Sequence, residues 1–299
     1  MVNLDAPRLE RVVFRSVFIF LFATLLSAMA IFLLRGMWWL VAVIAILIIF
    51  VCWATLVEPW LVHVARYKIP FVKEPRTWLK IAFVSDLHAD DRKRRPYYQM
   101  IVKKIEALKP DVLLLGGDVV EEESSAVEEL QPFEALTASL GKWFVLGNHD
   151  FFDNPGHIRS RLSDWGFKDA TNKEFLVGVG DRRLRLVGVD DCYFGNPQFN
   201  AKRVDDVPRV LLMHEPDNLL DIPEGSAELA LLGHTHGGQI RLPWLNHIVP
   251  IPQRVSQSFN RGLRRWGTMP VIISHGLGES SFGARFFCRP QIVLVEVGV

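Results

Sequence analysis

Five short apolar runs, each followed at once by residues that can bind metals, constrain the fold of this chain most. The runs are short and uncharged enough to form buried β-strands, and they cover Ile81–Val84, Val112–Leu115, Trp143–Leu146, Val210–Met213 and Leu229–Leu232. They are followed, in order, by Asp86-Leu87-His88, Gly116-Gly117-Asp118, Gly147-Asn148-His149-Asp150, His214 and Gly233-His234-Thr235-His236. Strands that all end in ligand-type residues predict a site along one edge of a sheet.

The rest of the pattern alternates helix and strand. Pro96–Leu108 carries apolar residues at helical spacing, a second helix is expected to begin near Glu121, and Pro155–Trp165 is followed by Gly166. Further strands are expected at Arg183–Val189, Val271–Ser274 and Ile292–Val297. Helices early and strands late predict an α/β fold, a layered β-sandwich flanked by helices.

Two long apolar runs dominate the N-terminal part. Ser16–Leu34 holds 19 consecutive uncharged residues, and Gly36–Val57 holds 22 more. A transmembrane helix needs about 20 apolar residues. A signal peptide has a shorter apolar core, of about 7–15 residues, and a pair of buried core helices is the other alternative. We favour a transmembrane hairpin with helices at about 16–34 and 36–57. Residues 1–57 would then form a membrane anchor, 58–78 a juxtamembrane linker and 79–299 the globular domain.

Basic residues predict the orientation of this hairpin. Three arginines precede the first run and five basic residues follow the second between Arg66 and Lys80, whereas the loop between the runs holds only Arg35. The positive-inside bias places both ends, and the globular domain, on the cytoplasmic side of a cell inner membrane. The basic residues after the second run suit anionic headgroups, or they belong to an ordinary solvated linker.

Charge and cysteine usage argue against two other classes of protein. The formal net charge of +1 gives no general reason to expect nucleic acid as a partner. The three cysteines are Cys52, Cys192 and Cys288, an odd number at wide spacing. They indicate neither a disulfide framework nor a zinc knuckle, and they suit a reducing compartment.

The ligand-type residues favour a site for two metal ions. Asp86 and His88 are one residue apart and would point to the same side of an extended strand end. The full set is Asp86, His88, Asp118, Asn148, His214, His234 and His236, which is more than one ion needs. Imidazole, carboxylate and amide ligands without thiolate suit manganese, iron or zinc. Two such ions about 3.5–4 Å apart can clamp a phosphoryl group.

Taken in order, these motifs resemble those of the calcineurin-like metallophosphoesterases. Gly233–Gln239 with Arg241-Leu242-Pro243, the Gly276-Leu277-Gly278 run and Arg285–Pro290 are similar to the YkuE/YaeI-type branch of that superfamily. The resemblance extends from Leu79 to about Val297, and no ligand departs from the pattern. It implies the calcineurin-like fold and a hydrolase that acts on phosphoric ester or diphosphate bonds.

The resemblance also implies a role for each residue. One metal would be held by Asp86, His88 and His236, and the other by Asn148, His214 and His234, with Asp118 bridging both. His149 would face the phosphate and stabilise the transition state or protonate the leaving oxygen. Asp150 would hold the ring of His149. Manganese is the metal expected first, with iron or zinc as alternatives.

Two further segments could choose the substrate. Arg92, Lys93, Arg94 and Arg95 follow the first metal motif, where arginines can bind a second phosphate, or they form a solvated face. We predict Arg92, Arg94, Arg95 and His275 as substrate-binding residues. The loop Pro243–Trp266 mixes apolar residues with four arginines. It either sits in lipid headgroups or packs on its own domain.

A membrane anchor favours a substrate in the same membrane. We therefore predict a metal-dependent hydrolase that cleaves a phosphodiester or pyrophosphate bond of a lipid-linked substrate. The resemblance points to UDP-2,3-diacylglucosamine, a substrate of lipid A biosynthesis. One alternative is a broad-specificity phosphodiesterase or phosphatase on other phospholipid, cell-envelope or nucleotide substrates. The other is a non-catalytic membrane scaffold with structural metals. The expected partners are the lipid bilayer and the phosphate-containing substrate, not nucleic acid.

Overall fold

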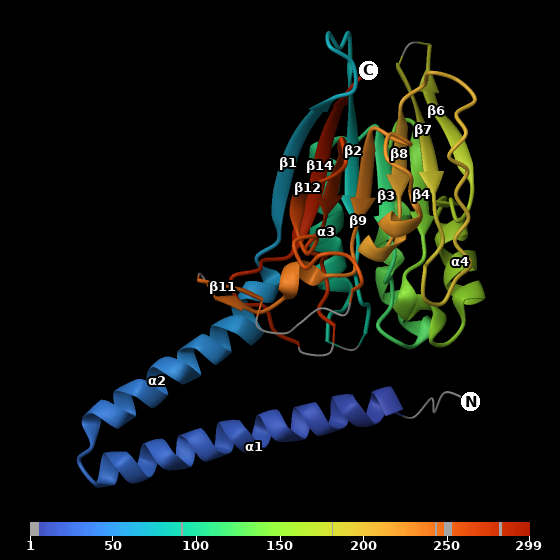
Figure 1. Ribbon diagram of the computed structural model, residues 1–299. Helices are drawn as coiled ribbons and strands as arrows, with labels where there is room; N and C mark the ends of the chain where they lie inside the picture. The colour runs from blue at the N-terminus through green and yellow to red at the C-terminus, as the bar shows by residue number, and fades with distance from the viewer. Residues whose placement is uncertain (1–5, 91, 181, 243, 248–252, 281–282) are drawn as a thin grey trace.

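The chain begins with two long helices that lead into a β-rich body. The computed structural model describes residues 6–90, 92–180, 182–242, 244–247, 253–280 and 283–299. Helix α1 (Ala6–Leu34) turns at Arg35–Gly36 into α2 (Trp38–Cys52). α2 continues through a π-helical turn, η1 (Trp53–Val57), and a 3-10 turn, η2 (Glu58–Trp60), into the first strand (Figure 1).

One helical stretch of the described residues is long and apolar enough to cross a membrane, Trp38–Trp60. In α1 the described apolar stretch is Ile19–Leu34, so among the described residues one of the two predicted spans meets the length that a membrane requires. Large apolar side chains on both helices are mostly exposed, including Ile19 at 68%, Trp38 at 66% and Ile49 at 64%. Such a surface on a helix is typical of contact with lipid or with another protein.

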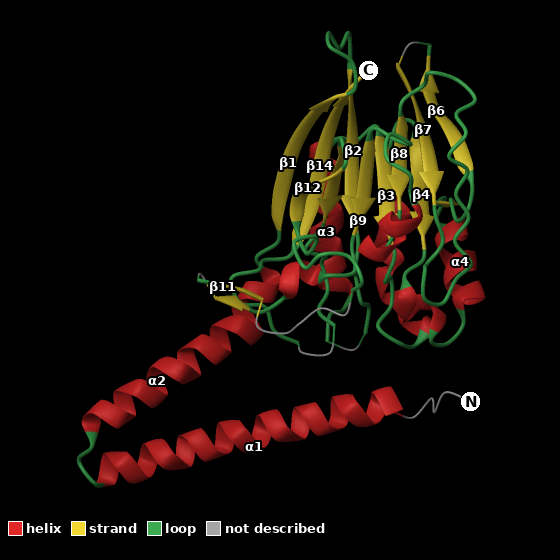
Figure 2. Cartoon of the chain, in the orientation of Figure 1, coloured by secondary structure: helices red, strands yellow, loops and turns green. Residues whose placement is uncertain are grey.

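Two six-stranded sheets form a sandwich (Figure 2). The first has, in order, β1 (His63–Pro70), β14 (Gln291–Gly298), β2 (Trp78–Val84), β3 (Val112–Gly116), β4 (Gly141–Val145) and β5 (Lys168–Asp169). The second has β12 (Gly262–Trp266), β13 (Met269–Ile273), β9 (Leu229–Leu232), β8 (Arg209–Leu212), β7 (Arg182–Gly188) and β6 (Glu174–Val179). A ribbon of β10 (Arg241–Leu242) and β11 (Leu245–His247) stands apart.

Parallel pairing brings the carboxyl ends of the central strands to one edge. In the first sheet β2, β3, β4 and β5 run parallel, and in the second β7, β8, β9 and β13 do. Figure 2 shows the arrowheads of the central strands of both sheets at the edge where α2 joins the body. The loops that follow these strands therefore meet near the end of the apolar helix.

Side-chain alternation along the strands separates three layers of core. Ile81 and Phe83 of β2 pack between the two sheets, whereas Ala82 and Val84 face the other way. On that outer face lie α3 (Arg95–Leu108), the 3-10 segment η3 (Ser124–Ala135) and α4 (Pro155–Asp164). The 3-10 turn η5 (Pro216–Asp221) covers part of the second sheet's outer face. The predicted α/β sandwich with flanking helices is confirmed.

Two predictions about local structure were wrong. The predicted linker 58–78 contains β1, which pairs in parallel with β14 from His63↔Gln291 to Pro70↔Gly298. Because its partner lies at the other end of the chain, the local pattern could not reveal this strand. The helix expected near Glu121 begins at Ser124 and has 3-10 geometry. Glu121 itself is buried at the site described below.

The end of the apolar stretch is fastened to the segment before β14. The backbone N–H of Arg285 donates to the carbonyl of Ala54 at 2.8 Å. The carboxylate of Glu58 accepts from the N–H of Cys288 at 2.6 Å and from Trp53 Nε1 at 3.0 Å. The rings of Phe50 and Phe286 meet edge to face, with centroids 5.7 Å apart. These contacts fix how the helix leaves the domain.

Candidate functional site

Every predicted metal ligand lies in a loop at the carboxyl end of a parallel strand. Asp86 and His88 follow β2, Asp118 follows β3, and Asn148 follows β4 in the first sheet. His214 follows β8, and His234 and His236 follow β9 in the second sheet. The site thus takes ligands from both sheets of the sandwich, and the structure brings all seven together.

The sequence had suggested an extended backbone at Asp86 and His88, but the backbone of these loops turns sharply. Both residues have positive φ angles, of 51° and 43°. Asp118, His234 and His236 share this left-handed conformation, with φ of 50°, 68° and 50°. This conformation is uncommon for any residue except glycine, but aspartate and histidine are among the residues that adopt it most often. Each side chain is therefore aimed by a sharp backbone turn rather than by strand alternation.

Close approach of the loops requires glycine at position 117. A Cβ added there would lie 2.6 Å from the backbone nitrogen of Gly147 and 2.7 Å from His214 Nδ1. Gly117 also has a φ of 87°, which L side chains rarely adopt. Gly117 therefore allows the loop after β3 to approach the loop after β4 and the ring of His214.

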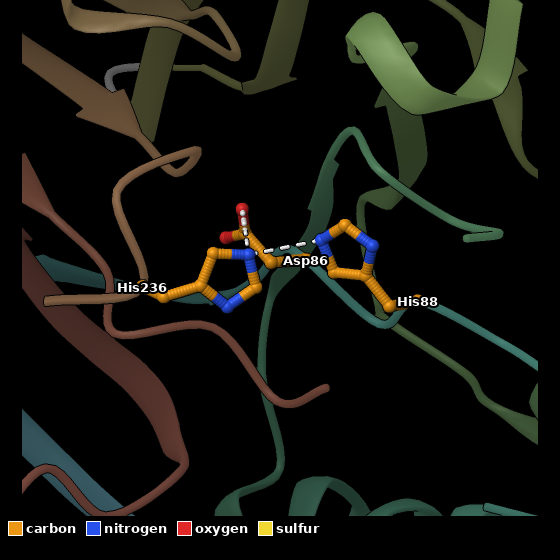
Figure 3. Close-up of side chains that lie close together, drawn as sticks. All are labelled: Asp86, His88 and His236. Atoms are coloured by element: carbon orange, nitrogen blue, oxygen red, sulfur yellow. Dashed lines mark hydrogen bonds and ion pairs between the residues drawn. The ribbon is translucent and has the colours of Figure 1, made fainter. Parts of the chain in front are cut away.

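The first group of ligand atoms contains Asp86, His88 and His236. Their ligand atoms lie within 4.8 Å of one another, and all three side chains are buried. His236 Nε2 is 2.9 Å from His88 Nε2 and 3.7 Å from Asp86 Oδ1 (Figure 3). Asp86 is itself held by the backbone N–H of His234, which donates to Oδ1 at 2.6 Å.

The second group contains Asp118, His214 and His234, with Asn148 beside it. These three offer ligand atoms within 4.8 Å of one another. His234 Nδ1 lies 3.1 Å from Asn148 Oδ1. Asp118 Oδ2 stands between the groups, 3.1 Å from His214 Nε2 and 3.4 Å from His88 Nε2. This position is the one that a bridging carboxylate would occupy.

The donor set fits divalent cations. His214 Nδ1 donates to the carbonyl of Gly116 at 2.7 Å, and the Glu121 carboxylate lies against His88 Nδ1. With the proton on Nδ1, each ring presents the lone pair of Nε2 to the carboxylate of Asp118. His214 Nε2 is a buried atom without a hydrogen-bond partner among the described residues. A cation bound between the Nε2 lone pairs and the Asp118 carboxylate would be coordinated by both and would remove the repulsion between them.

The electrostatics of the site point the same way. Burial lowers the pKa of His88, but the carboxylates of Glu121 and Asp118 outweigh it and raise that pKa to about 9. Burial also lowers the pKa of His214, but the carboxylate of Asp118 outweighs burial and raises that pKa well above its ordinary value. Burial and the nearby His214 lower the pKa of His234 to about 3, which leaves a neutral imidazole. The carboxylates thus attract positive charge to this place: without a metal it is carried by protons on His88 and His214, and a bound cation would displace those protons.

His149 belongs to neither of these two groups; with His88 and Glu121 it forms a third cluster whose potential ligand atoms lie within 4.8 Å of one another. Its ring packs edge to face on His88, with centroids 4.7 Å apart, and its side chain is 20% exposed. Its ring Nδ1 lies 2.7 Å from the backbone carbonyl of Glu121. The backbone N–H of His149 donates to Asp118 Oδ1 at 2.9 Å. A partly exposed ring held at Nδ1 is suited to meet a substrate with the rest of its edge.

The predicted role of Asp150 was wrong. Its carboxylate accepts from the backbone N–H groups of Val119, Val120 and Gly147, at 2.8, 3.1 and 3.0 Å. Asp150 therefore ties the loop after β3 to the loop after β4, while the Glu121 carbonyl orients His149. The sequence placed Asp150 next to His149, and adjacency along the chain does not make the side chains partners.

Glu121 is the functional residue that sequence reasoning missed. Its side chain is 4% exposed, its carboxylate lies against His88 Nδ1, and its carbonyl holds His149. Carboxylates in this position orient a ligand imidazole and raise its basicity. Its place three residues after Asp118 could have indicated this role, but the acidic run that follows it favoured a helix start.

The predicted substrate-binding residues are spread over different surroundings. Arg92 pairs with the carboxylate of Asp90, and its Nη2 donates to the carbonyl of Glu279 at 2.9 Å and lies 3.6 Å from Glu121 Oε1. Arg94 and Arg95 are exposed. The ring of His275 lies beside the ring of His63, with centroids 6.0 Å apart. Within Pro243–Trp266, Pro243 and residues 248–252 lie outside the described residues, and Trp244 is 88% exposed.

Comparisons with known proteins agree with this site. The pattern of the family described as calcineurin-like phosphoesterase matches residues 79–238. The chain is 27% identical over 254 residues to the uncharacterized metallophosphoesterase YkuE of Bacillus subtilis, covering 81% of this chain and 87% of that protein. It is 28% identical over 251 residues to phosphodiesterase YaeI of Escherichia coli, covering 80% and 90%. It is 25% identical over 308 residues to UDP-2,3-diacylglucosamine pyrophosphatase LpxG of Chlamydia trachomatis, covering 82% and 92%.

The match includes every ligand of the site. Residues 79–238 make up more than half of the chain and run from β2 to the last ligand, His236. Metal-ligating atoms, a carboxylate between two groups and a histidine beside them stand at the strand ends within that range. The protein is thus a hydrolase with candidate sites for divalent metals, and the chain belongs to the calcineurin-like phosphoesterase family.

Proposed function

We propose that this protein is a membrane-anchored hydrolase that cleaves a phosphodiester or pyrophosphate bond of a lipid-linked substrate. The position of the site carries the proposal. The strand ends that hold the ligands lie at the edge where the apolar stretch Trp38–Trp60 joins the domain (Figure 1). An anchor at this edge raises the effective concentration only of a substrate held in the same membrane.

The ligand residues would hold two divalent ions, manganese foremost. Asp86, His88 and His236 form one set, Asn148, His214 and His234 the other, and Asp118 belongs to both. Ions bound there supply Lewis-acid polarisation of phosphoryl oxygens and make water nucleophilic at neutral pH. The protein's own part is to fix the ligands on rigid strand ends and to keep the imidazoles of His214 and His88 in one tautomer through Gly116 and Glu121.

His149 is the residue we propose to act on the phosphate. Its Nδ1–H is held by the Glu121 carbonyl, so a proton at Nε2 makes the ring cationic. The Glu121 carboxylate, 3.8 Å from Nδ1, offsets that charge. A ring in this state can donate from Nε2 to a non-bridging oxygen or to the leaving oxygen.

Replacing His149 by Ala separates chemistry from metal binding. We expect turnover to fall by about 10²–10⁴-fold, the usual contribution of a positioned acid, while metal content stays near that of the wild type. Turnover of a chromogenic phosphodiester and metal analysis of the same preparation measure both. Asp150→Asn serves as the contrast, because it would disturb the loops after β3 and β4 and lower folding stability as well. Unchanged turnover of His149→Ala would contradict the assignment.

The lipid part of the proposal is supported by the name of one relative. LpxG is a UDP-2,3-diacylglucosamine pyrophosphatase, and it aligns with 82% of this chain. We propose the same lipid as substrate, cleaved to an acylated sugar phosphate and UMP. Purified protein in detergent with Mn²⁺ should release UMP from this lipid. Hydrolysis of a soluble phosphodiester without any release of UMP would reject the lipid and retain the reaction class.

A second candidate is a phosphodiesterase of broad specificity. The relative YaeI is named a phosphodiesterase, and it aligns with 80% of this chain. Comparable kcat/KM values for soluble diesters, nucleotides and the lipid would favour this candidate. A preference of more than about 10²-fold for the lipid would exclude it, because such a ratio needs dedicated binding contacts.

We further propose a hairpin of α1 and α2 in a cell inner membrane, with both ends and the domain in the cytoplasm. The distribution of basic residues supports it, with only Arg35 between the two apolar runs. In inverted membrane vesicles, added protease should then digest the domain. Protection of the domain would place it on the opposite side.

A further inference from the structure

A pocket of about 440 Å³ lies where the apolar stretch meets the domain. We call it the junction pocket. One wall is Trp53 at the end of the apolar stretch, together with Leu61 after it. The facing wall is Phe286 and Phe287, from the segment before β14. Its volume falls within the usual range of small-molecule sites, about 300–1,000 Å³.

The apolar wall of the junction pocket is open to the surroundings. Trp53 is 44% exposed and Phe287 is 57% exposed, although both are large apolar side chains. Phe287 also has a φ of 51°, a left-handed backbone conformation that a bulky residue rarely adopts. Strain of this kind persists where the surroundings need the side chain in one place. An exposed aromatic wall continuous with an apolar helix is suited to hydrocarbon.

The polar lining of the junction pocket includes one cation, Arg289. Arg289 lies at its rim and is exposed, with Nε donating to the carbonyl of Leu61 at 2.9 Å. Glu58 is the acidic side chain of the lining, and both of its oxygens already accept hydrogen bonds from Cys288 and Trp53. Burial, with the charge of nearby arginines, lowers the pKa of His275 to about 3, so this ring is neutral. The guanidinium of Arg289 is therefore the charge available to an anionic group.

An unpartnered polar atom adds a second sign of a ligand. His275 Nδ1 is buried and has no hydrogen-bond partner among the described residues. Buried polar atoms in native proteins are almost always hydrogen-bonded. A ligand with an ester or phosphate oxygen could supply that partner.

We propose that the junction pocket binds one acyl chain of an anionic phospholipid from the surrounding membrane, with the lipid phosphate beside Arg289. The aromatic wall buries the chain, and the guanidinium selects a negative headgroup. The site stands at the level where an apolar helix ends, which is where phosphates lie in a bilayer. The proposal rests on the membrane placement of α2 and not on which phosphoester the metal site cleaves.

Cross-linking from the lipid tests the proposal on the full chain. The protein is placed in nanodiscs of phosphatidylcholine that contain a small fraction of phosphatidylglycerol with a photoactivatable diazirine near the end of one acyl chain. After illumination, adducts are located by peptide mass spectrometry. We expect adducts at Trp53 and at Phe286–Cys288. Adducts on Trp38–Phe50, the bilayer-facing part of α2, provide the internal reference.

Two pocket variants and one control make the outcome decisive. Phe287→Asn suits the left-handed backbone and removes the apolar wall, so pocket adducts should fall about tenfold relative to the α2 reference. Arg289→Gln should lower them by a similar factor for the phosphatidylglycerol probe and little for a phosphatidylcholine probe. Leu176→Asn changes an apolar residue that is 51% exposed on β6 and should have no effect.

The possible results separate the pocket from the catalytic proposal. Pocket adducts that stay unchanged in both pocket variants, or that are absent while α2 is labelled, would overturn the lipid site. Equal labelling by both probes would reject the anionic headgroup. Hydrolysis of a soluble phosphodiester is measured in parallel. Labelling in a protein that hydrolyses no phosphoester would contradict the proposed function and leave the lipid site standing.

Discussion

At the scale of single residues, the ligands are aimed by backbone turns that the loops stabilise in one another. The N–H of Asp86 donates to the carbonyl of Gly117 at 2.9 Å, and the N–H of His88 donates to that of Asp118 at 3.0 Å. These bonds join the loops after β2 and β3 and offset the strain of three left-handed residues, Asp86, His88 and Asp118. The geometry of the site is therefore a property of the paired loops, not of any one motif.

Glu121 offers the sharpest prediction at this scale. Glu121→Gln keeps the shape of the side chain but removes the charge that faces His88 Nδ1. We expect divalent metal to bind about 10–100-fold more weakly, as for other residues that orient a metal ligand. Calorimetric titration with Mn²⁺ measures the change. Glu134→Gln, at an exposed position, is the matched control. An unchanged affinity would show that His88 needs no such partner.

At the scale of elements, the segment 285–288 links the apolar helix to the loop after β9, which carries His236. Its backbone N–H groups donate to the carbonyl of Ala54 and to the carboxylate of Glu58 at the end of the apolar helix. On its other side, Cys288 Sγ donates to the carbonyl of the ligand His236 at 3.2 Å. The buried Arg285 holds this segment in place through Glu279 and the carbonyls of His275 and Cys288. One short segment thus contacts both the apolar helix and the candidate site.

Glu58 is the residue whose loss should loosen this junction. It is 4% exposed, and Glu58→Gln leaves either the N–H of Cys288 or Trp53 Nε1 without an acceptor. A buried donor left unpaired costs about 1–3 kcal/mol of folding free energy. Urea denaturation followed by circular dichroism, in the same detergent, measures the loss. The exposed Glu74→Gln should be neutral. A Glu58→Gln protein as stable as the wild type would show that water replaces the lost acceptor.

At the scale of the whole molecule, the site joins the two sheets. Asp118 comes from the first sheet and His214 from the second, and their ligand atoms lie 3.1 Å apart. Ions bound between them would tie the sandwich together at its open edge. A metal ion that binds only the folded state must therefore stabilise the folded state.

Metal addition should raise the melting temperature of the whole domain. At a free Mn²⁺ concentration of 100 times the Kd, the expected gain is about 2.7 kcal/mol. Thermal melts with Mn²⁺ and with a chelator measure it. Asp118→Asn should abolish most of this gain, because Asp118 faces both groups of ligands. The exposed Asp164→Asn is the control. A melting temperature that ignores Mn²⁺ in the wild type would contradict a metal site between the sheets.

Much of the site could be predicted because every candidate ligand lies shortly after one of five strands. The runs Ile81–Val84, Val112–Leu115 and Leu229–Leu232 lie within or coincide with observed strands. Parallel strands that end in polar residues leave those residues at one edge of the sheet. Position along the chain therefore determined that the ligands would meet.

The tertiary structure decided what local patterns do not encode. The pairing of β1 with β14 joins residues more than two hundred positions apart, so nothing near His63 indicates it. The partners of His149 and His88 depend on how Glu121 turns inward, which is set by the packing of the loop after β3 against the loop after β4. The sequence by itself determined the ligands and the class of chemistry. The folded chain decided which side chain orients each of them and where the apolar helix joins the site, because both depend on contacts between distant segments.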